Sequence, residues 1–441
     1  MTKNLKRLLN IIIVMLPCFT SFAQETLGKR EVIEQALKYN YDIQVANNNI
    51  TSAMNNASIY NSGYLPTISG TAGATYNIST SNVTFADGSE RAISGLKTNS
   101  YNSRLNINYT LYDGNGRKYS FKSLKETYNL TQLQARQIIE TSLISIFTIY
   151  YDVARLTQNQ MNLIQSINIS RERLQRARYG FEYGQNTQLD VLNSEVNFNT
   201  DSINYLNVSQ ELENTKRNLN YLLGRDISTT FNVDTTVVYM VGLTLDGLLT
   251  RALQNNVQLL QDQSAIKSSK YEIISSKSGY IPKINLTLGY GWDQRDNGSV
   301  SFLTNSSSYG PTASATLSWN LFDGGLTRIR LQGNKINLEN RKIVEKQNEQ
   351  LIKRNLVNAW GGYQNSLFVL KAESKNLETN RLNFERTQEQ NKLGQITSIV
   401  FREAQQNLLQ SQLNFNKAKY DAKIAELALL QLSGDLLTAE F

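Results

Sequence analysis

Two segments of this chain share one pattern: Tyr109-Thr110-Leu111-Tyr112-Asp113-Gly114 in the first half and Trp319-Asn320-Leu321-Phe322-Asp323-Gly324 in the second. Each alternates apolar and polar residues, as a half-buried strand does, and then continues with Asp and Gly. An Asp accepts hydrogen bonds from the first N–H groups of a helix, and Gly allows the tight turn before it. Both segments therefore predict a strand that leads directly into a helix, with the Asp in a structural and not a catalytic role.

Further landmarks recur in the same order in both halves, at a spacing of about 210–216 residues. They are Ala36-Leu37, Asn40, Leu65-Pro66 and Gly184-Gln185 in the first half, against Ala252-Leu253, Asn256, Ile281-Pro282 and Gly394-Gln395 in the second. This order predicts an internal duplication, with repeats over residues 24–232 and 233–441. Each repeat is expected to contain a helix, a strand pair (66–113 and 281–323) and a pair of long helices (116–224 and 325–434).

The expected strands have one apolar and one polar face. After Pro66, Ile68, Gly70 and Ala72 alternate with Ser69 and Thr71, and the other three strands repeat the alternation. A transmembrane barrel with lipid outside and water inside has this pattern. A soluble half-buried sheet has it too, so the strands by themselves leave both open. The polar segments 79–99 and 293–310 are expected to be long outer loops.

The helices are expected to be unusually long. The first helix of the chain is predicted over 31–61. Nothing breaks a helix between residues 116 and 183, which would reach roughly 100 Å at the rise of an α-helix. Apolar residues at alternating spacings of four and three predict a coiled-coil seam. The predicted seam residues are Leu143, Phe147, Tyr150, Ala154, Met161 and Ile164 in the first repeat, and Ile352, Leu356, Ala359, Tyr363 and Leu370 in the second.

The composition of the 441 residues excludes several kinds of site. There is no His, and the single Cys18 lies in an N-terminal apolar run. Ser-His-Asp and Cys-His catalysis need an imidazole, and zinc sites are built largely on His and Cys. No nucleophile–base pair or metal cluster stands out, so we predict no enzymatic activity, no cofactor and no metal. The net charge is +8, or +5 without the three basic residues of 1–23, and gives no case for nucleic acid binding.

Residues 1–23 have the three parts of a secretory signal peptide: a basic start, an apolar stretch, and Ser21-Phe22-Ala23 before the cleavage point. Lipidation at Cys18 is not expected, because Met15-Leu16-Pro17 is a poor lipobox. No run of 18 apolar residues follows. An exported chain of this kind is periplasmic, secreted, or a β-protein of the outer membrane.

The number of strands bears on assembly. One chain supplies four expected strands, whereas bacterial single-chain barrels begin at about eight. An open sheet edge is not stable in lipid, because its backbone groups have no partners there. A membrane barrel would therefore be shared between copies: three copies give about twelve strands and two give about eight.

The sequence resembles the TolC family of outer-membrane efflux and secretion ducts over its whole mature length. The residues that carry the resemblance are the Leu65-Pro66 and Ile281-Pro282 pairs, Leu321-Phe322-Asp323-Gly324-Gly325, and Tyr183-Gly184 followed by Leu189-Asp190-Val191-Leu192. The resemblance implies an α+β membrane protein. It would be a homotrimer with a 12-stranded barrel in outer-membrane lipid, continued by a long periplasmic α-helical coiled-coil barrel, in a Gram-negative bacterium.

The resemblance also implies a function and its residues. The chain would be the passive exit duct of a tripartite efflux or type I secretion system, docked by a periplasmic adaptor that joins it to an inner-membrane transporter. Docking is expected at the helix-turn tips. Family members close the periplasmic gate with acidic rings and helix–helix links, and the departures described next imply that this chain closes it by different contacts. The docking candidates are Gly184, Gln185, Gly394 and Gln395, and the gate candidates are Asp190 and Glu403.

Some positions depart from the family pattern. Val400 stands where well-known members have an acidic ring residue, and Asn391 and Ile396 replace the gate-linking Tyr and Arg. Asp190 and Glu403 are also explained as solvated residues near a helix start, which the helix dipole favours. The basic residues before the first tip (Arg171, Arg173, Arg176 and Arg178) are explained more simply by the dipole at a helix end than by adaptor recognition. The alternative function is a trimeric coiled-coil structural or adhesive surface protein without a pore.

Overall fold

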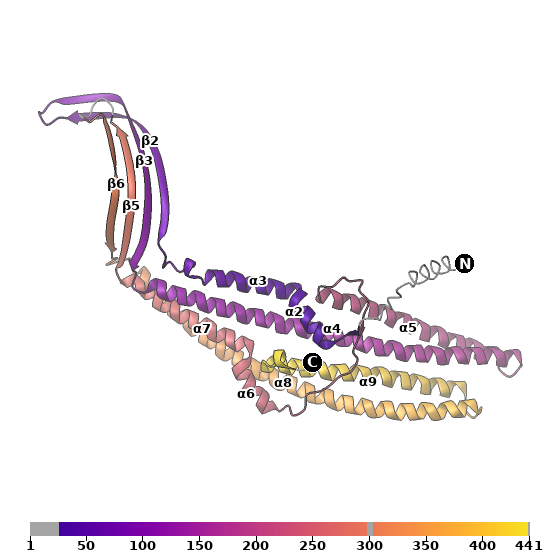
Figure 1. Ribbon diagram of the computed structural model, residues 1–441. Helices are drawn as coiled ribbons and strands as arrows, with labels where there is room; N and C mark the ends of the chain where they lie inside the picture. The colour runs from indigo at the N-terminus through magenta and orange to yellow at the C-terminus, as the bar shows by residue number, and fades with distance from the viewer. Residues whose placement is uncertain (1–25, 298–302, 440–441) are drawn as a thin grey trace, which may run out of the picture. The chain divides into compact units, whose positions relative to one another are not determined.

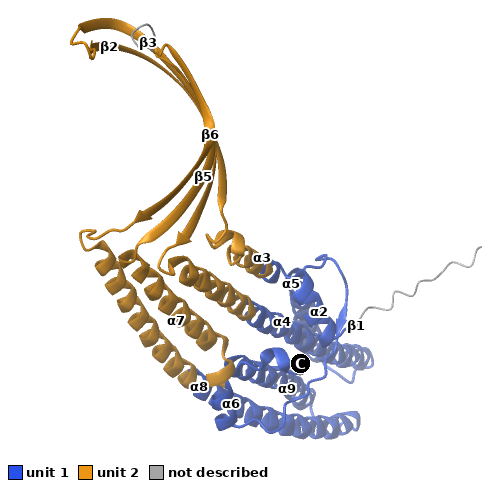
Figure 2. Cartoon of the chain, turned by 60° about the vertical axis from the view of Figure 1, so that its left-hand side comes forward, with its two compact units in different colours: residues 1–44, 138–251, 355–441 blue, residues 45–137, 252–354 orange. Residues whose placement is uncertain are grey.

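The structure is a computed structural model that describes residues 26–297 and 303–439. The chain forms two compact units: residues 1–44, 138–251 and 355–441 make unit 1, and residues 45–137 and 252–354 make unit 2 (Figure 2). Each unit contains residues from both halves of the sequence. The two longest helices, α4 (Gly116–Glu182) and α8 (Leu326–Lys392), each begin in unit 2 and end in unit 1. The expected signal peptide, 1–23, lies outside the described residues.

Unit 2 contains one four-stranded antiparallel sheet, with the strands side by side in the order β2-β3-β5-β6 (Figure 1). The strands are β2 (Thr67–Thr84), β3 (Glu90–Tyr112), β5 (Lys283–Asp296) and β6 (Asn305–Ser318). The central pair, β3 and β5, joins the two halves of the sequence. Within the described residues, the outer strands, β2 and β6, each pair on one side only.

The register confirms the predicted alternation, because paired residues of neighbouring strands lie on one face. One row across the sheet is Ile68, Ile107, Leu288 and Ala313, and the next row is Ser69, Asn106, Gly289 and Thr312. On the polar face, Arg104 Nη2 lies 3.1 Å from a carboxylate oxygen of Asp293. On the apolar face, the exposed fractions are 67% for Ile68, 54% for Leu105 and 63% for Leu317. The apolar face is thus open to the surroundings, which a soluble half-buried sheet would cover.

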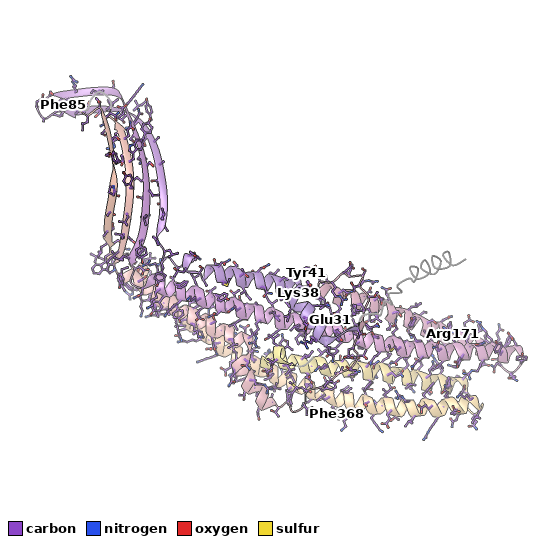
Figure 3. The ribbon with its side chains drawn as sticks, in the orientation of Figure 1. Glu31, Lys38, Tyr41, Phe85, Arg171 and Phe368 are labelled. Atoms are coloured by element: carbon purple, nitrogen blue, oxygen red, sulfur yellow. The ribbon has the colours of Figure 1, made fainter. Side chains whose placement is uncertain are left out.

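The two long outer loops expected at 79–99 and 293–310 were wrong. Strands β2 and β3 continue through the first segment, pairing Thr84 with Glu90, and the turn between them begins at Phe85 (Figure 3). Asp87 accepts hydrogen bonds from Ser89, and Gly88 has a left-handed backbone (φ +82°). In the second segment, β5 extends to Asp296 and β6 starts at Asn305. Ser, Thr and Asn conceal the alternation here, but backbone pairing is independent of side-chain polarity.

The helix expected over 31–61 is two α-helices, α2 (Lys29–Tyr39) and α3 (Tyr41–Asn56), followed by a 3₁₀ turn at Ile59–Asn61. Asn40 breaks it with an extended backbone. Its Nδ2 donates to Leu222 O (2.8 Å), and its Oδ1 accepts from Ile43 N (3.2 Å). In the second half, Asn256 separates α6 (Leu245–Asn255) from α7 (Val257–Ser276) and accepts from Gln258 N at 3.0 Å. At both positions the Asn side chain caps the start of a new helix, although the helical spacing of apolar residues continues through the break.

The predicted strand-to-helix corner is confirmed in the first half, where β3 ends at Tyr112 and α4 begins at Gly116. In the second half the strand prediction was wrong for residues 319–322: β6 ends at Ser318, opposite the first residue of β5, so these residues lie beyond the strand pairing. The capping Asp is present in both halves. Asp113 Oδ2 accepts from Arg117 N at 2.8 Å, and Asp323 Oδ2 accepts from Thr327 N at 2.9 Å. Gly114 and Gly324 both have left-handed backbones (φ +65° and +69°). Among the described residues, no helix is long and apolar enough to span a bilayer.

The core of unit 1 lies where α4 meets the chain's first strand and the segment between the two repeats. Phe147, Tyr150 and Tyr151 are fully buried. The Tyr150 hydroxyl donates to Leu27 O and accepts from Asp234 N, both at 3.0 Å. Leu27 belongs to β1 (Thr26–Leu27), and Asp234 directly follows β4 (Asn232–Val233), the strand that pairs with β1. The Tyr150 hydroxyl therefore bonds both segments to α4.

The predicted seam is right for four of its six residues on α4 and for three of its five on α8, where Ala359 and Leu370 are only partly buried. Leu143, Phe147, Tyr150 and Ala154 are buried, as are Ile352, Leu356 and Tyr363 of the second repeat. The prediction was wrong for Met161 and Ile164, which are 57% and 41% exposed. The buried positions there are Asn159, Leu163, Ser166, Ile167, Ser170, Arg173, Leu174 and Ala177. The spacing of fours and threes continues through this stretch, but four of its positions are polar, and apolar periodicity alone does not identify them.

Candidate functional site

The two helix-turn tips of unit 1 have the same geometry. Helix α4 ends at Glu182 and α5 (Gln188–Leu222) returns, and helix α8 ends at Lys392 and α9 (Ser398–Ser433) returns. Gly184 and Gly394 each have φ +71°, and an added Cβ would meet nothing within 4 Å at either. Replacing these glycines therefore strains the backbone without causing a clash.

Asp190 is engaged at the start of α5. Its carboxylate accepts from Thr187 N (2.9 Å) and Thr187 Oγ1 (2.7 Å), and Thr187 Oγ1 accepts from Asp190 N (3.3 Å), a reciprocal capping box. The hydrogen bonds from Thr187 hold the pKa of this carboxyl below its usual value. In the second repeat, Thr397 caps Val400 N in the same way at 3.4 Å, but Val400 returns no bond. The missing acid thus removes half of a capping box.

Glu403 lies one turn further along α9 and is exposed. Within residues 26–297 and 303–439, no hydrogen bond or ion pair engages its carboxylate. Its neighbour Arg402 points into a buried network instead. The structure therefore places the two gate candidates near the tips but in different situations, since Asp190 is bonded to its own helix start and Glu403 is free to meet another group.

The buried network lies between the two helical hairpins and was not predicted from the sequence. Asp201 of α5 is fully buried and accepts from Arg402 Nη1 and Nη2 of α9, both at 2.7 Å. Ser166 and Ser170 of α4 also donate to Asp201, the first at 3.2 Å. Gln405 of α9 donates to Ser166 O at 3.1 Å. Burial alone would raise the pKa of Asp201, but these hydrogen bonds outweigh it and hold that pKa below its usual value.

Arg173 makes a second link between α4 and α9. Its Nη2 donates to Ser398 O (3.1 Å) and Ser398 Oγ (2.6 Å), and its guanidinium lies 5.3 Å from the centre of the Phe401 ring. Burial, with further contributions from Arg402 and Arg176, lowers its pKa to about 10. The neighbouring Arg171, on the last part of α4, is exposed (Figure 3). Of the four arginines before the tip, Arg173 is thus a buried structural link, and the seam spacing from Ser166 and Ser170 is the signal that identifies it.

A groove of about 510 Å³ lies beside these links. Its lining includes Arg173, Arg176, Asp190, Asn391 and Lys392. Asn391, which stands in place of the family's gate-linking Tyr, therefore lies at the surface between the tips. In the part of the chain that the structure describes, no three His, Cys, Asp or Glu side chains are grouped as metal ligands.

A family model described as "Outer membrane efflux protein" matches residues 32–225 and 248–435. The chain belongs to the outer membrane efflux protein family. As such a protein, it lies in the outer membrane, with helices in the periplasm. The two matched segments correspond closely to the two halves in which the landmarks recur. The resemblance drawn from Leu65-Pro66, Ile281-Pro282 and residues 321–325 is confirmed.

Individual relatives of this outer membrane efflux protein are distant in sequence. It is 21% identical over 397 residues to the outer membrane efflux protein BepC of Brucella suis biovar 1 (strain 1330). This alignment covers 86% of this chain and 79% of BepC. Its fold is similar to the CmeC outer membrane channel of Campylobacter jejuni, with TM-score 0.76, 15% identity and coverage of 92% and 85% of the two chains. It is also similar to VceC of Vibrio cholerae, with TM-score 0.72, 14% identity and coverage of 92% and 95%.

Proposed function

We propose that three copies of this efflux protein form a passive exit duct, with one 12-stranded barrel in the outer membrane and a coiled-coil barrel of helices in the periplasm. The observation that carries the proposal is the sheet of unit 2. In the part of the chain that the structure describes, its edge strands β2 and β6 have no partner on one side, and its apolar face is exposed. In lipid, unpaired backbone groups cost several kcal/mol each, at an order of magnitude. Pairing β2 of one copy with β6 of the next removes every edge.

The other face of the sheet supports a water-filled lumen. Arg104 and Asp293 form an ion pair there, and Asn106, Asn108 and Thr312 lie in the neighbouring rows. Three copies are favoured over two because a barrel of about eight strands is filled by its own side chains, whereas a larger one leaves a channel. The repetition of landmarks and of element order in both halves supports an origin by internal duplication, with repeats at 24–232 and 233–441.

We also propose the partners that the family implies: a periplasmic adaptor that docks at Gly184-Gln185 and Gly394-Gln395, and an inner-membrane transporter behind it. The duct adds no chemistry of its own in this proposal. The gate would lie near Asp190 and Glu403, where the helices approach the tips. The links Asp201–Arg402 and Arg173–Ser398 would hold the two hairpins of one copy together in the closed state.

Conductance and mass together test the duct. The purified protein should have the mass of three copies by light scattering in detergent, should dissociate on heating, and should conduct ions in a planar bilayer. The alternative, a surface coiled coil without a pore, predicts the trimer without conductance. A mass equal to one copy would contradict the shared barrel.

A further inference from the structure

Positive charge is concentrated at the ends of the helices that adjoin the sheet of unit 2. Residues 113–125, 266–280 and 323–335, taken together, contain ten Lys or Arg and three Asp or Glu, an excess of seven. The whole chain carries only +8, of which three positive charges belong to residues 1–23. The remaining chain outside these segments is therefore slightly negative. This basic collar comprises Arg117, Lys118, Lys122 and Lys125 on α4, Lys267, Lys270 and Lys277 on and after α7, and Arg328, Arg330 and Lys335 on α8.

A continuous line of contacts shows which way part of the collar faces. Tyr109 of β3 pairs with Leu286, on the apolar face of the sheet. The Arg117 guanidinium lies 6.0 Å from the centre of the Tyr109 ring and 5.3 Å from that of Tyr64. Tyr64 makes an edge contact with Phe121 at 6.3 Å, and Lys125 Nζ lies 4.7 Å from the Phe121 ring. Arg117, Phe121 and Lys125, spaced by four residues, therefore continue the apolar face onto α4.

The collar continues from α4 to α7. Lys122 Nζ lies 5.2 Å from the Tyr119 ring and 5.6 Å from the Tyr271 ring, and the two rings are 6.0 Å apart. Lys270 adjoins Tyr271 in sequence and is exposed. Ammonium groups and aromatic rings thus alternate across two neighbouring helices.

The acids within these segments leave the lysines uncompensated. Asp113 pairs with Arg117 at 3.2 Å, and Asp323 caps α8. The third acid, Glu272, forms no salt bridge within the described residues. Within residues 26–297 and 303–439, no salt bridge engages Lys118, Lys122 or Lys125, and all three are exposed. Aromatic residues gather at the same edge of the sheet, where Trp319 Nε1 donates to Tyr280 O at 3.1 Å. Aromatic rings and long basic side chains beside an apolar band are the groups that anchor a protein at a membrane surface.

We propose that the basic collar binds the phosphate groups of anionic phospholipids in the periplasmic leaflet of the outer membrane. The proposal rests on the apolar face of the barrel lying in that membrane. The collar begins where the apolar face ends, and so at headgroup level on the periplasmic side. The ammonium groups of Lys122 and Lys125, which lie beside aromatic rings, would contact the phosphates at this level. An anionic surface attracts nearby Lys and Arg within about 10 Å at moderate ionic strength.

Tryptophan quenching by brominated lipids tests this directly. Trp292→Phe and Trp360→Phe leave Trp319, at the collar edge of the sheet, as the remaining tryptophan. The full-length protein in this background is reconstituted into bilayers that contain brominated phosphatidylglycerol or brominated phosphatidylcholine. We expect phosphatidylglycerol to be preferred at low salt and the preference to disappear at high salt. The triple variant Lys118→Gln/Lys122→Gln/Lys125→Gln should lower the preference severalfold, since each cation contributes a factor of about five at most.

The matched control is Lys38→Gln/Lys371→Gln/Lys375→Gln, which removes the same charge from exposed positions of α2 and α8 in unit 1. It should keep the preference. Equal binding of the two lipids by the parent protein, or an unchanged preference in the collar variant, would overturn the proposal. Planar-bilayer conductance of the same variants separates this result from the duct itself. If the parent protein conducts ions but shows no lipid preference, only the collar proposal is overturned. If the parent protein does not conduct, the result counts against the duct.

Discussion

Arg402 of α9 and Asp201 of α5 form a bidentate ion pair, with Nη2–Oδ1 and Nη1–Oδ2 both at 2.7 Å. The Asp201 side chain is fully buried, and that of Arg402 is 14% exposed. The two residues belong to different repeats, so the pair fastens one helical hairpin to the other. Serines of α4 complete the bonds to the carboxylate. Breaking a buried charge pair leaves the remaining charge without a partner, which strongly destabilises the fold.

The Asp201→Asn substitution should destabilise unit 1 by about 3–5 kcal/mol, because it leaves Arg402 buried and uncompensated. If the pair holds the hairpins in the closed duct, the same substitution should also raise conductance. Chemical unfolding and single-channel recording measure the two effects. Asp421→Asn is the control, since Asp421 pairs with Lys417 at the surface and should contribute less than about 1 kcal/mol. An equal loss in both variants would contradict the role of burial.

The Asp201 pair should fail in acid. Because the pKa of the folded Asp201 carboxyl lies below its unfolded value, its contribution is present at neutral pH, above that unfolded value. It is lost as the pH falls below about 4 and through the folded pKa. The difference in melting temperature between the parent protein and Asp201→Asn should therefore shrink from pH 7 to pH 3. A difference that stays constant over this range would show that the charge of Asp201 does not stabilise the fold.

Replacing the tip glycines, Gly184→Val and Gly394→Val, should weaken coupling to the adaptor while the trimer stays intact. Both positions have a left-handed backbone, which a β-branched residue adopts at a cost of about 1–2 kcal/mol. Because an added side chain meets nothing nearby, the strain stays local to the tip. Export in cells and trimer mass in detergent are the measurements. Unchanged export in the double variant would count against docking at the tips.

Glu403, a gate candidate, and Val400, which stands in place of an acid, should differ in the effect of their substitution on ion selectivity. Glu403→Gln should lower a modest cation selectivity, since three free carboxylates near a narrow opening attract cations. Val400→Ala should change it little. The measurement is the reversal potential under a salt gradient. An identical reversal potential in Glu403→Gln would mean that this carboxylate does not face the lumen.

The sequence by itself determined the order of the main elements and which residues of a strand share a face, but not every boundary: residues 31–61 form two α-helices and a turn, and residues 79–99 are largely strand. Alternation places Ile68, Ile107 and Leu288 on one face of the sheet without knowledge of their partners, because side chains in a strand point to opposite faces in turn. Asp113 and Asp323 cap helices through neighbours four residues away. Both are short-range effects, and residue types at fixed spacing therefore predict them.

Only the tertiary structure decided which polar residues are buried. Ser166, Ser170 and Arg173 continue the seam of α4 because Asp201, Ser398 and Arg402, distant in sequence, supply their hydrogen bonds. Met161 and Ile164 look like better seam residues, yet they are exposed in the folded chain. A polar side chain is buried at low cost only when its partners are in place. Those partners lie up to 232 residues away along the chain, so the fold had to bring them together first.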